Sequence, residues 1–287
     1  MAAAGGAADR VAVIGAGTMG HGIAQVAALA GCRVELADTS VQRVQIGLER
    51  IRANLDEGVA RGKLTAAARE SALDGINGIT DIAAAVHGVD VVIEAVPEQM
   101  DLKVRVLGAA SAAAPPHALL ASNTSALPIT EMQRALPDPA RVVGMHFFNP
   151  VHIMALVEVV RGRDTSDHVL DAAVAFARRL GKEPIVVQDS PGFASSRLGV
   201  ALGLEAMRML EEGVASAEDI DRAMELGYRH PMGPLRLSDL IGLDVRLDIA
   251  RHLHAALGGE RFRPPAILER LVAEGHLGRK SGHGFYN

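Results

Sequence analysis

A glycine-rich turn directly follows the first apolar run and constrains the fold more than any other feature. Val11 to Ile14 (VAVI) leads into Gly15-Ala-Gly-Thr-Met-Gly20, and helical spacing continues to Ala30. In a G-x-G-x-x-G turn between strand and helix, the first glycine permits the turn and the second lets backbone N–H groups approach a pyrophosphate. The third lets the helix pack on the strand. We therefore predict a dinucleotide-binding unit with cofactor contacts at Gly15, Gly17, Thr18, Met19 and Gly20.

An acidic residue ends the second predicted strand and indicates which dinucleotide is bound. The run Arg33 to Ala37 is followed by Asp38. A carboxylate at this place binds the adenosine-ribose hydroxyls and repels a 2′-phosphate, which favours NAD over NADP. Arg43 lies one turn further on and could reach the same pocket, so NADP stays open as the weaker candidate. The alternative for Arg43 is a solvated helix residue.

Strand-like and helix-like segments alternate over the first two thirds of the chain. Apolar runs predict strands at 11–14, 33–37, 89–95, 118–121, 142–145, 156–160 and 184–187, and helical spacing predicts helices at 19–30, 41–61, 102–114 and 169–180, with Thr65 capping a short extra helix. This alternation predicts an α/β, Rossmann-type, doubly wound and mostly parallel sheet over residues 1–190. From residue 191 only helical patterns follow, so residues 191–287 are predicted to form a small all-helical domain.

Composition excludes several kinds of partner. The chain carries 29 Lys+Arg against 34 Asp+Glu, a net charge of −5, and has no Trp, 2 Tyr and 6 Phe. Without a basic run or an aromatic platform, nucleic acid is not an expected partner. The two long uncharged runs, 11–32 and 106–130, are interrupted by glycines or by Pro115-Pro116. Neither is a credible membrane span.

The single cysteine and the leader indicate the compartment. Cys32 cannot form an internal disulfide, which fits a reducing environment. The leader from Met1 to Asp9 lacks the basic start and apolar stretch of a signal peptide, so we read it as a frayed terminus of a cytoplasmic protein. His252 and His254 are two apart on a predicted helix and point in different directions, so no metal site is expected.

Two ionisable residues lie in otherwise apolar runs. His146 ends VVGMH and Glu158 lies in the middle of LVEVV, and a buried carboxylate without a partner is costly. Asn149-Pro150 separates the two runs, and because proline cannot continue a ladder the strands can return side by side. Glu158 could then accept from one ring nitrogen of His146 while the other faces a ligand, which is a general base with its orienting group. The alternative, which we weigh equally, is that His146 is a hydrogen-bonded core histidine and Glu158 is an exposed residue at the edge of the sheet.

A polar turn, Ser122-Asn-Thr-Ser125, follows the fourth predicted strand. Ligands bind at the carboxyl ends of strands in open α/β sheets, so these hydroxyls could orient a substrate oxygen. Polar turn residues are more often helix caps, which is the alternative.

Eight motifs in order extend the comparison to almost the whole chain. They are GAGTMGHGIAQ, VIEAVPE, SNTS, GMHFFNPVHIM, LVEVV, DSPGF, AMELGYRHPMGPL and GRKSGHGFY. Together they resemble the L-3-hydroxyacyl-CoA dehydrogenases, and within them the bacterial type that acts on 3-hydroxybutyryl-CoA. The resemblance implies an NAD-dependent oxidoreductase that interconverts a (3S)-3-hydroxyacyl-CoA and a 3-ketoacyl-CoA, with short chains favoured.

The resemblance also implies roles for individual residues. It gives His146 as the catalytic base, Glu158 as its partner and Ser125 as the group that holds the substrate oxygen. Further NAD contacts are implied at Glu98, Lys103, Asn149 and Lys280, and CoA contacts at Asn54 and Arg61. Ser196 stands where the family commonly has a substrate-binding Asn, a departure that puts turnover rate and chain-length preference in doubt.

The resemblance further implies a homodimer formed through the helical domain. The helix from Gly192 to Glu212 is apolar on more than one face, which suits a partner subunit but would equally suit a core helix. Two alternative functions stay open: a sugar-acid (L-gulonate) 3-dehydrogenase of the lambda-crystallin type, and a catalytically silent dinucleotide-binding protein.

Overall fold

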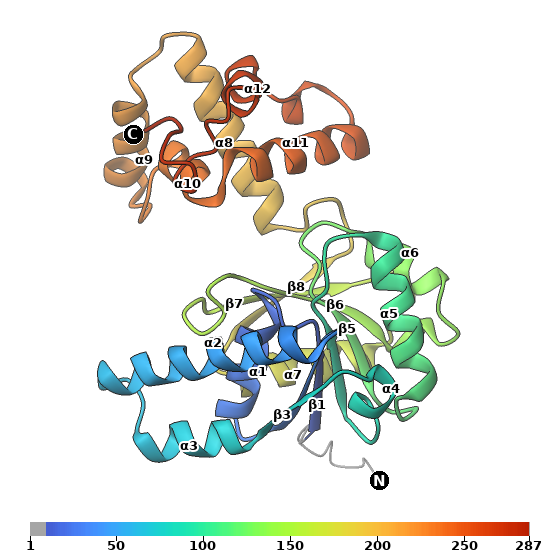
Figure 1. The fold of residues 1–287 in the computed structure, drawn as a ribbon. Helices are drawn as coiled ribbons and strands as arrows, with labels where there is room; N and C mark the ends of the chain where they lie inside the picture. The colour runs from blue at the N-terminus through green and yellow to red at the C-terminus, as the bar shows by residue number, and fades with distance from the viewer. Residues whose placement is uncertain (1–9, 287) are drawn as a thin grey trace. The chain divides into compact units, whose positions relative to one another are not determined.

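The computed structural model describes residues 10–286, so the predicted frayed leader lies outside the described residues. The chain divides into two compact units, one that ends at Asp189 and one that begins at Ser190. The first contains a sheet flanked by helices, and the second is built from helices (Figure 1).

The sheet of the first unit has eight strands in the order β3-β2-β1-β4-β5-β6-β7-β8. Their bounds are β1 Arg10–Ile14, β2 Arg33–Ala37, β3 Ile76–Ile79, β4 Val91–Glu94, β5 Leu119–Ser122, β6 Val142–Phe147, β7 Leu156–Arg161 and β8 Glu183–Gln188. All neighbouring pairs are parallel except β6 and β7, which are antiparallel. The predicted Rossmann-type, mostly parallel sheet is confirmed.

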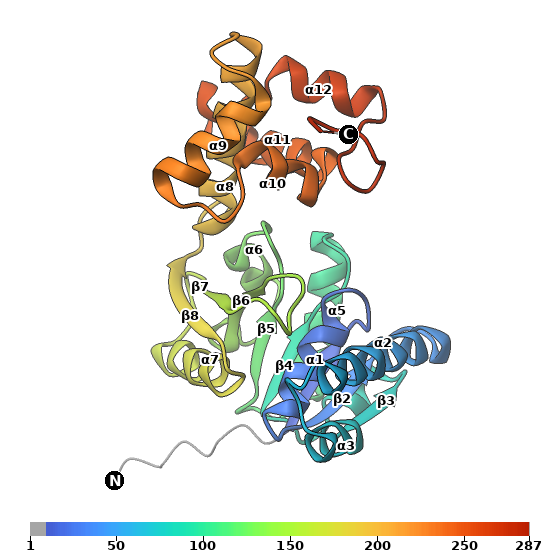
Figure 2. The ribbon, with the colours of Figure 1, turned by 90° about the vertical axis from the view of Figure 1, so that its left-hand side faces the viewer.

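Helices cover both faces of this sheet. They are α1 Gly20–Leu29, α2 Val41–Ala60, α3 Ala66–Asp74, α4 Ile82–Ala85, α5 Met100–Ala113, α6 Ile129–Arg134 and α7 Asp167–Arg179, with a 3₁₀ turn, η1 Pro139–Arg141. Figure 1 shows α5 and α6 on one side of the sheet and α1 and α2 on the other, and Figure 2 gives the view turned by 90°. The predicted cap is present, since Thr65 Oγ1 accepts from the backbone N–H of Ala68 at 3.1 Å.

The edge strand β3 was not predicted from the sequence. Its four residues, INGI, contain only two apolar side chains, so they lack the continuous apolar run of the other strands. It pairs with β2 from Val34↔Ile76 onward, and Asn77 donates to Glu35 at 2.7 Å. A Cβ at Gly78 would lie 2.5 Å from a methyl of Val44, so the glycine lets α2 approach this edge closely.

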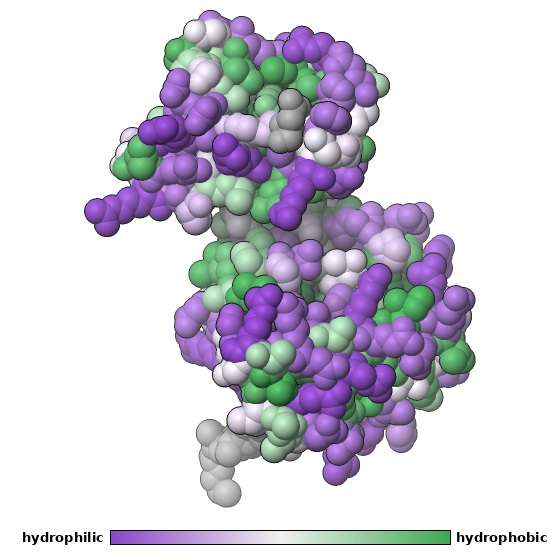
Figure 3. All heavy atoms as spheres, turned by 60° about the vertical axis from the view of Figure 1, so that its left-hand side comes forward, coloured by the Kyte–Doolittle hydropathy of each residue, from purple (hydrophilic) through white to green (hydrophobic). Residues whose placement is uncertain are grey.

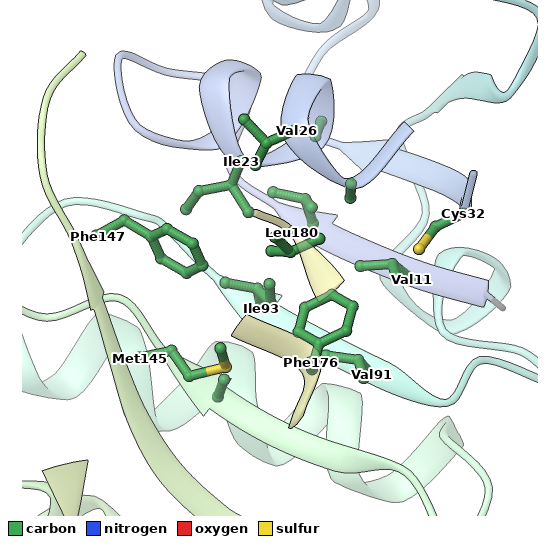
Figure 4. Close-up of a cluster of buried hydrophobic side chains, with 14 of the residues drawn as sticks. Val11, Ile23, Val26, Cys32, Val91, Ile93, Met145, Phe147, Phe176 and Leu180 are labelled. Atoms are coloured by element: carbon green, nitrogen blue, oxygen red, sulfur yellow. The ribbon is translucent and has the colours of Figure 1, made fainter. Parts of the chain in front are cut away.

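The core on one face of the sheet joins segments that are far apart in the sequence. Side chains of α1 and α7, among them Ile23 and Phe176, pack over the strands together with Ile93 and Met145 (Figure 4). Most of these side chains are fully shielded from solvent. Close packing of this kind holds the strand ends, and the turns that follow them, in fixed positions.

The second unit contains five α-helices and one 3₁₀ turn in its described part. They are α8 Ser195–Glu211, α9 Ala217–Tyr228, α10 Pro234–Ile241, α11 Leu243–Leu257, η2 Glu260–Phe262 and α12 Ala266–Ala273. Ser216 caps α9, accepting from the N–H of Asp219 at 3.1 Å. The last residues are fastened to this unit, because Asp239 accepts from the N–H groups of Phe285 and Tyr286 at 3.0 and 2.9 Å.

Within residues 10–286, no helix is both long and apolar enough to cross a membrane. On the face drawn in Figure 3, hydrophilic residues are interspersed with smaller hydrophobic areas on both units. The same residues contain no group of three or more His, Cys, Asp or Glu side chains arranged to hold a metal ion.

Candidate active site

The glycine turn between β1 and α1 has the geometry of a phosphate-binding loop. Gly15 has φ +106°, and a Cβ there would lie 2.6 Å from the carbonyl oxygen of Ala95. A Cβ at Gly20 would lie 1.6 Å from the carbonyl oxygen of Gly15, so the strand and helix meet too closely for any side chain. At Gly17, by contrast, an added Cβ meets no protein atom within 4 Å. The space at Gly17 is therefore available to a ligand.

The start of α1 is suited to an anion. No side chain caps this helix at Met19, and the first N–H groups of a helix carry a partial positive charge. The turn lines a cavity of about 520 Å³, a usual size for a ligand site. The residues present thus fit a dinucleotide whose pyrophosphate lies at the helix start.

Asp38 lines the same cavity and is rigidly held. Its Oδ2 accepts from the N–H of Ala16 at 2.8 Å, and its Oδ1 accepts from the N–H of Thr39 at 2.7 Å. Arg43 also lines the cavity. Several lining residues were not predicted from the sequence: Thr39, Thr80, Ile82, Ala95, Val96, Pro97, Leu102 and Val106. A usable signal was their position, because they follow β2, β3 and β4 or lie in the first two turns of the next helix, where ligand sites of such sheets lie.

His146 and Glu158 face each other on the antiparallel pair β6 and β7. They are directly opposite in the ladder, and His146 Nδ1 lies 2.8 Å from Glu158 Oε2. Glu158 is completely buried and His146 is 5% exposed. The ring of Phe148 lies against the imidazole, with ring centroids 4.4 Å apart. The carboxylate fixes Nδ1 as the ring nitrogen that faces it, so Nε2 is the nitrogen on the side away from Glu158.

The turn after β5 is tied to both of its neighbours. Asn123 accepts from the N–H of Phe147 at 2.9 Å, which links the turn to the residue after His146. On the other side, Glu98 Oε1 accepts from the N–H of Ser125 at 2.8 Å and from the hydroxyl of Thr124 at 2.6 Å. Ser125 itself is exposed. The fold thus holds the Ser125 backbone at the carboxyl ends of β5, which Asn123 follows, and of β6, which carries His146.

Glu98 and Lys103, both expected to contact the cofactor, are part of one ionic network. Lys103 is completely buried, and its Nζ lies 3.3 Å from Glu98 Oε2 and 2.8 Å from Glu94 Oε1. Glu94 is a buried residue of this network that was not predicted. The signal was present, since Glu94 is a carboxylate inside the apolar run VDVVIEAV, as Glu158 is inside LVEVV.

Asn149 is exposed at the start of the segment that joins β6 to β7. Lys182 holds the next residues of that segment, donating to the carbonyl oxygens of Val151 and Met154, the latter at 2.8 Å. Burial lowers the pKa of Lys182 below its usual value. This anchoring fixes the position at which Asn149 leaves the sheet.

The two residues expected to meet CoA lie on α2. Asn54 lies within the helix, and Arg61 is its C-cap residue. They are seven residues apart, and this spacing places both side chains on the same face of the helix. Asn54 donates to Gln25 at 3.1 Å, and the exposed Arg61 pairs with Glu57 at 2.5 Å.

Two histidines of this unit have lowered pKa values. Burial lowers the pKa of His21 on α1. Burial, together with the nearby positive charge of His21, lowers the pKa of His152.

The remaining two predicted site residues belong to the second unit. Ser196 lies in the first turn of α8 and is partly exposed. Lys280 is exposed and pairs with Asp244, their charged atoms lying 2.5 Å apart.

Comparison with known proteins identifies the family. Residues 10–190 match the family described as 3-hydroxyacyl-CoA dehydrogenase, NAD binding domain, and residues 192–287 match its C-terminal domain. The chain belongs to the 3-hydroxyacyl-CoA dehydrogenases. The predicted family and enzyme class are thereby confirmed, and the cofactor is a nicotinamide dinucleotide.

Individual relatives agree over nearly full length. The chain is 44% identical to a probable 3-hydroxybutyryl-CoA dehydrogenase of Bacillus subtilis, covering 97% of this chain and 96% of that one. It is 42% identical to a 3-hydroxybutyryl-CoA dehydrogenase of Bradyrhizobium diazoefficiens, covering 97% and 94%. The crystal structure of (S)-3-hydroxybutyryl-CoA dehydrogenase from Ralstonia eutropha has a TM-score of 0.94, at 43% identity over 97% and 98% of the two chains.

Proposed function

We propose that this chain catalyses the NAD-dependent interconversion of a (3S)-3-hydroxyacyl-CoA and a 3-ketoacyl-CoA, with 3-hydroxybutyryl-CoA and acetoacetyl-CoA as the preferred pair. The observation that carries the proposal is the buried His146–Glu158 pair at 2.8 Å. An imidazole with a fixed tautomer and a fully buried carboxylate behind it is the apparatus needed to move a proton to and from an alcohol. The names of the relatives support the substrate.

In the oxidative direction, Nε2 of His146 takes the proton of the C3 hydroxyl as the C3–H bond breaks. NAD, when bound, supplies the hydride acceptor, so the substrate loses one hydride and one proton. Glu158 stabilises the imidazolium that forms. Ser125 donates to the substrate oxygen and orients it, and in the reductive direction His146 returns the proton to the forming alkoxide.

The preference for NAD over NADP rests on Asp38. Its carboxylate lines the cavity and would repel a 2′-phosphate, whereas Arg43 in the same cavity would attract one. We expect NADH to bind more tightly than NADPH, and Asp38→Ser to narrow that difference by about tenfold or more. Fluorescence titration of both nucleotides checks this, and equal affinities for the unmodified protein would refute the preference.

We assign acyl-CoA recognition to Asn54 and Arg61 of α2 and its C-cap, and we assign Ser196 to the substrate near its reacting oxygen. Lys280 is assigned to the cofactor.

A homodimer formed through residues 191–287 is part of the same proposal. Light scattering measures the mass in solution, and a value of 30.1 kDa, the mass of one chain, would exclude the dimer. Cytoplasmic localisation also remains a prediction.

The deciding experiment is the loss of NADH absorbance on adding acetoacetyl-CoA. Turnover is expected for the unmodified protein and should fall about 100-fold or more in His146→Ala. His168→Ala, an exposed histidine on α7, is the matched control and should keep full activity. Equal turnover in His146→Ala would refute the mechanism.

Substrate range and the two alternatives are resolved with the same assay. Chains of C4 should be reduced faster than those of C8 to C16. Oxidation of L-gulonate without turnover of any acyl-CoA would instead indicate a sugar-acid dehydrogenase. NADH binding without turnover of either substrate would indicate a silent dinucleotide-binding protein.

A further inference from the structure

Two histidines that the proposed mechanism does not use lie beside the start of α1. His21 is the second residue of α1 and is half-buried, whereas His152 is exposed in the segment that joins β6 to β7. Their chain neighbours are in close contact, because a Cβ at Gly22 would lie 2.9 Å from the Cβ of Val151. Lys182 donates to the carbonyl oxygen of Val151 and fixes the segment there. Packing therefore brings the two histidines together from segments far apart in the sequence.

Arg50 of α2 lies beside the same place. Gln25, one turn after His21 on α1, accepts from Asn54 at 3.1 Å, so the two helices meet at these positions (Figures 1 and 2). Arg50 precedes Asn54 by one turn of α2 and lies on the same face. Its exposed guanidinium takes part in none of the ion pairs formed within residues 10–286. A cation without a carboxylate partner thus adjoins the two histidines.

The imidazole of His21 is oriented by the glycine turn. Its Nδ1 donates to the carbonyl oxygen of Gly17 at 2.7 Å, which leaves Nε2 for a ligand. Partial burial lowers the pKa of His21, and the charge of Arg50 lowers it further. A phosphate reverses this balance, because a nearby negative charge favours the imidazolium, whose Nε2–H can donate to a phosphate oxygen.

Positive charge also predominates around His152. Partial burial lowers its pKa, and the charges of His21 and Lys182 lower it further, while Glu57 acts in the opposite direction. Glu57 is itself paired with Arg61. The place where α1, α2 and the segment between β6 and β7 meet therefore favours an anion, in a chain whose net charge is −5.

The position of this cluster distinguishes between the two phosphate-bearing ligands of the proposed reaction. None of its three residues, His21, Arg50 and His152, lines the dinucleotide cavity. Arg50 instead shares a face of α2 with Asn54 and Arg61, which are assigned to CoA. CoA carries a pyrophosphate and a 3′-phosphate, and guanidinium and imidazolium groups form charge-assisted hydrogen bonds to phosphate oxygens.

We propose that His21, Arg50 and His152 form a phosphate subsite for the CoA part of the substrate. The subsite supplements the contacts assigned to Asn54 and Arg61. This inference rests on the proposed function, because it takes an acyl-CoA as the substrate. The three side chains act on binding and not on the reacting atoms, so they affect KM rather than kcat. A thioester with the same acyl group but without phosphates gains nothing from them.

The test compares acetoacetyl-CoA with acetoacetyl-pantetheine, which has the same thioester and acyl group but no phosphate. The variants are Arg50→Gln, His152→Ala and the double variant, and none of them removes the bond between His21 and Gly17. Arg52→Gln is the control, because this exposed arginine lies two residues along α2 on a different face. NADH absorbance gives kcat and KM, and fluorescence titration gives the Kd for NADH.

The KM for acetoacetyl-CoA should rise about threefold or more in each single variant and about tenfold or more in the double variant. The kcat, the KM for acetoacetyl-pantetheine and the Kd for NADH should stay within about twofold of the unmodified values. His21→Ala also removes the bond to Gly17. In this variant the KM for acetoacetyl-CoA should rise about threefold or more beyond any rise for acetoacetyl-pantetheine.

Three outcomes would overturn the proposal. The first is an unchanged KM for acetoacetyl-CoA in the double variant. The second is an equal rise in KM for the two thioesters, which would mean that the cluster does not act on phosphates. The third is a rise of about tenfold in the Kd for NADH with an unchanged KM for acetoacetyl-CoA, which would assign the cluster to the dinucleotide.

Failure of the proposed function is distinguishable from failure of the subsite. If the unmodified protein does not reduce acetoacetyl-CoA, the proposed function fails, and calorimetric titration of CoA then judges the subsite. Weaker binding of CoA by the double variant than by the unmodified protein would support the subsite. Equal binding by the two proteins, or binding by neither, would overturn it.

Discussion

Glu158 lies directly opposite His146 in the antiparallel ladder of β6 and β7, with 2.8 Å between its Oε2 and the imidazole Nδ1. The positions of both side chains are thus set by backbone hydrogen bonds of the sheet. Because Glu158 is completely buried, bulk water does not solvate its carboxylate, and the contact with the imidazole helps to offset the cost of burying it.

Replacing Glu158 by Gln should lower kcat by about 10²- to 10⁴-fold, because the amide neither carries the charge that stabilises an imidazolium nor enforces one tautomer. NADH affinity should change little, since the glycine turn and Asp38 are untouched. Steady-state kinetics and NADH titration measure both effects. Glu183→Gln on the neighbouring strand β8, where the side chain is exposed, is the control. A kcat within threefold of the unmodified enzyme would contradict the role of the pair.

Alanine at Gly17 and at Gly20 should have opposite consequences. At Gly17 the added methyl group meets no protein atom within 4 Å, so Tm should be retained while NADH affinity falls by about tenfold or more. At Gly20 the methyl group would lie 1.6 Å from the carbonyl oxygen of Gly15. The free energy of unfolding should therefore fall by about 3 kcal/mol or more. Thermal unfolding and NADH titration distinguish the two variants. If both variants lost the same amount in Tm, the space beside Gly17 would not be open.

Replacing Arg246 by Met should stabilise the protein. This guanidinium on α11 is 4% exposed, its Nε has no hydrogen-bond partner within residues 10–286, and burial lowers its pKa to about 10. Because the folded-state pKa lies below the usual 12.5, the penalty is fully present at neutral pH and declines only as pH rises through 10. We expect the free energy of unfolding to rise by about 1–3 kcal/mol.

Urea unfolding at pH 7 measures this change. Arg270→Met, an exposed arginine on α12, is the control and should change the free energy of unfolding by less than about 0.5 kcal/mol. A less stable Arg246→Met protein would mean that an acceptor meets this guanidinium in the assembled enzyme.

Removing the hydroxyl of Tyr286 should loosen the C-terminal segment. The hydroxyl donates to Asp221 Oδ2 at 2.8 Å, and burial with this carboxylate raises the pKa of Tyr286 above its usual 10.0. Tyr286→Phe should therefore cost about 1–2 kcal/mol. Since the folded-state pKa is raised, this contribution is fully present below pH 10 and is lost as pH rises further. The unfolding curves of the two proteins should differ at pH 7 and lie closer together at pH 11.

The sequence was most informative where a residue type conflicted with its surroundings. Glu158 and His146 stood out because ionisable groups interrupted two apolar runs, and the proline between them indicated a chain reversal. The same reasoning applied to Glu94 would have indicated a buried partner. Lys103 follows the buried face of α5 at the spacing of Leu107 and Ala110, so its burial was readable as well.

Other features could not be read from the sequence because tertiary contacts decide them. β3 is a strand only because β2 offers it an unpaired edge, and its INGI sequence has little strand preference of its own. The short helices α4 and α6 contain too few turns to show a period. The lining of the cofactor cavity depends on which strand ends become neighbours, and this follows from the strand order.

The antiparallel ladder between β6 and β7 also determines where this enzyme tolerates insertions and deletions. A one-residue shift within either strand would turn Glu158 or His146 to the opposite face of the sheet. Residues 148–155 lie between the strands and outside the ladder, and Ile153 there is 68% exposed. A change of length beside Ile153 would therefore leave His146 and Glu158 facing each other, whereas the buried Val151 in the same segment is held by Lys182.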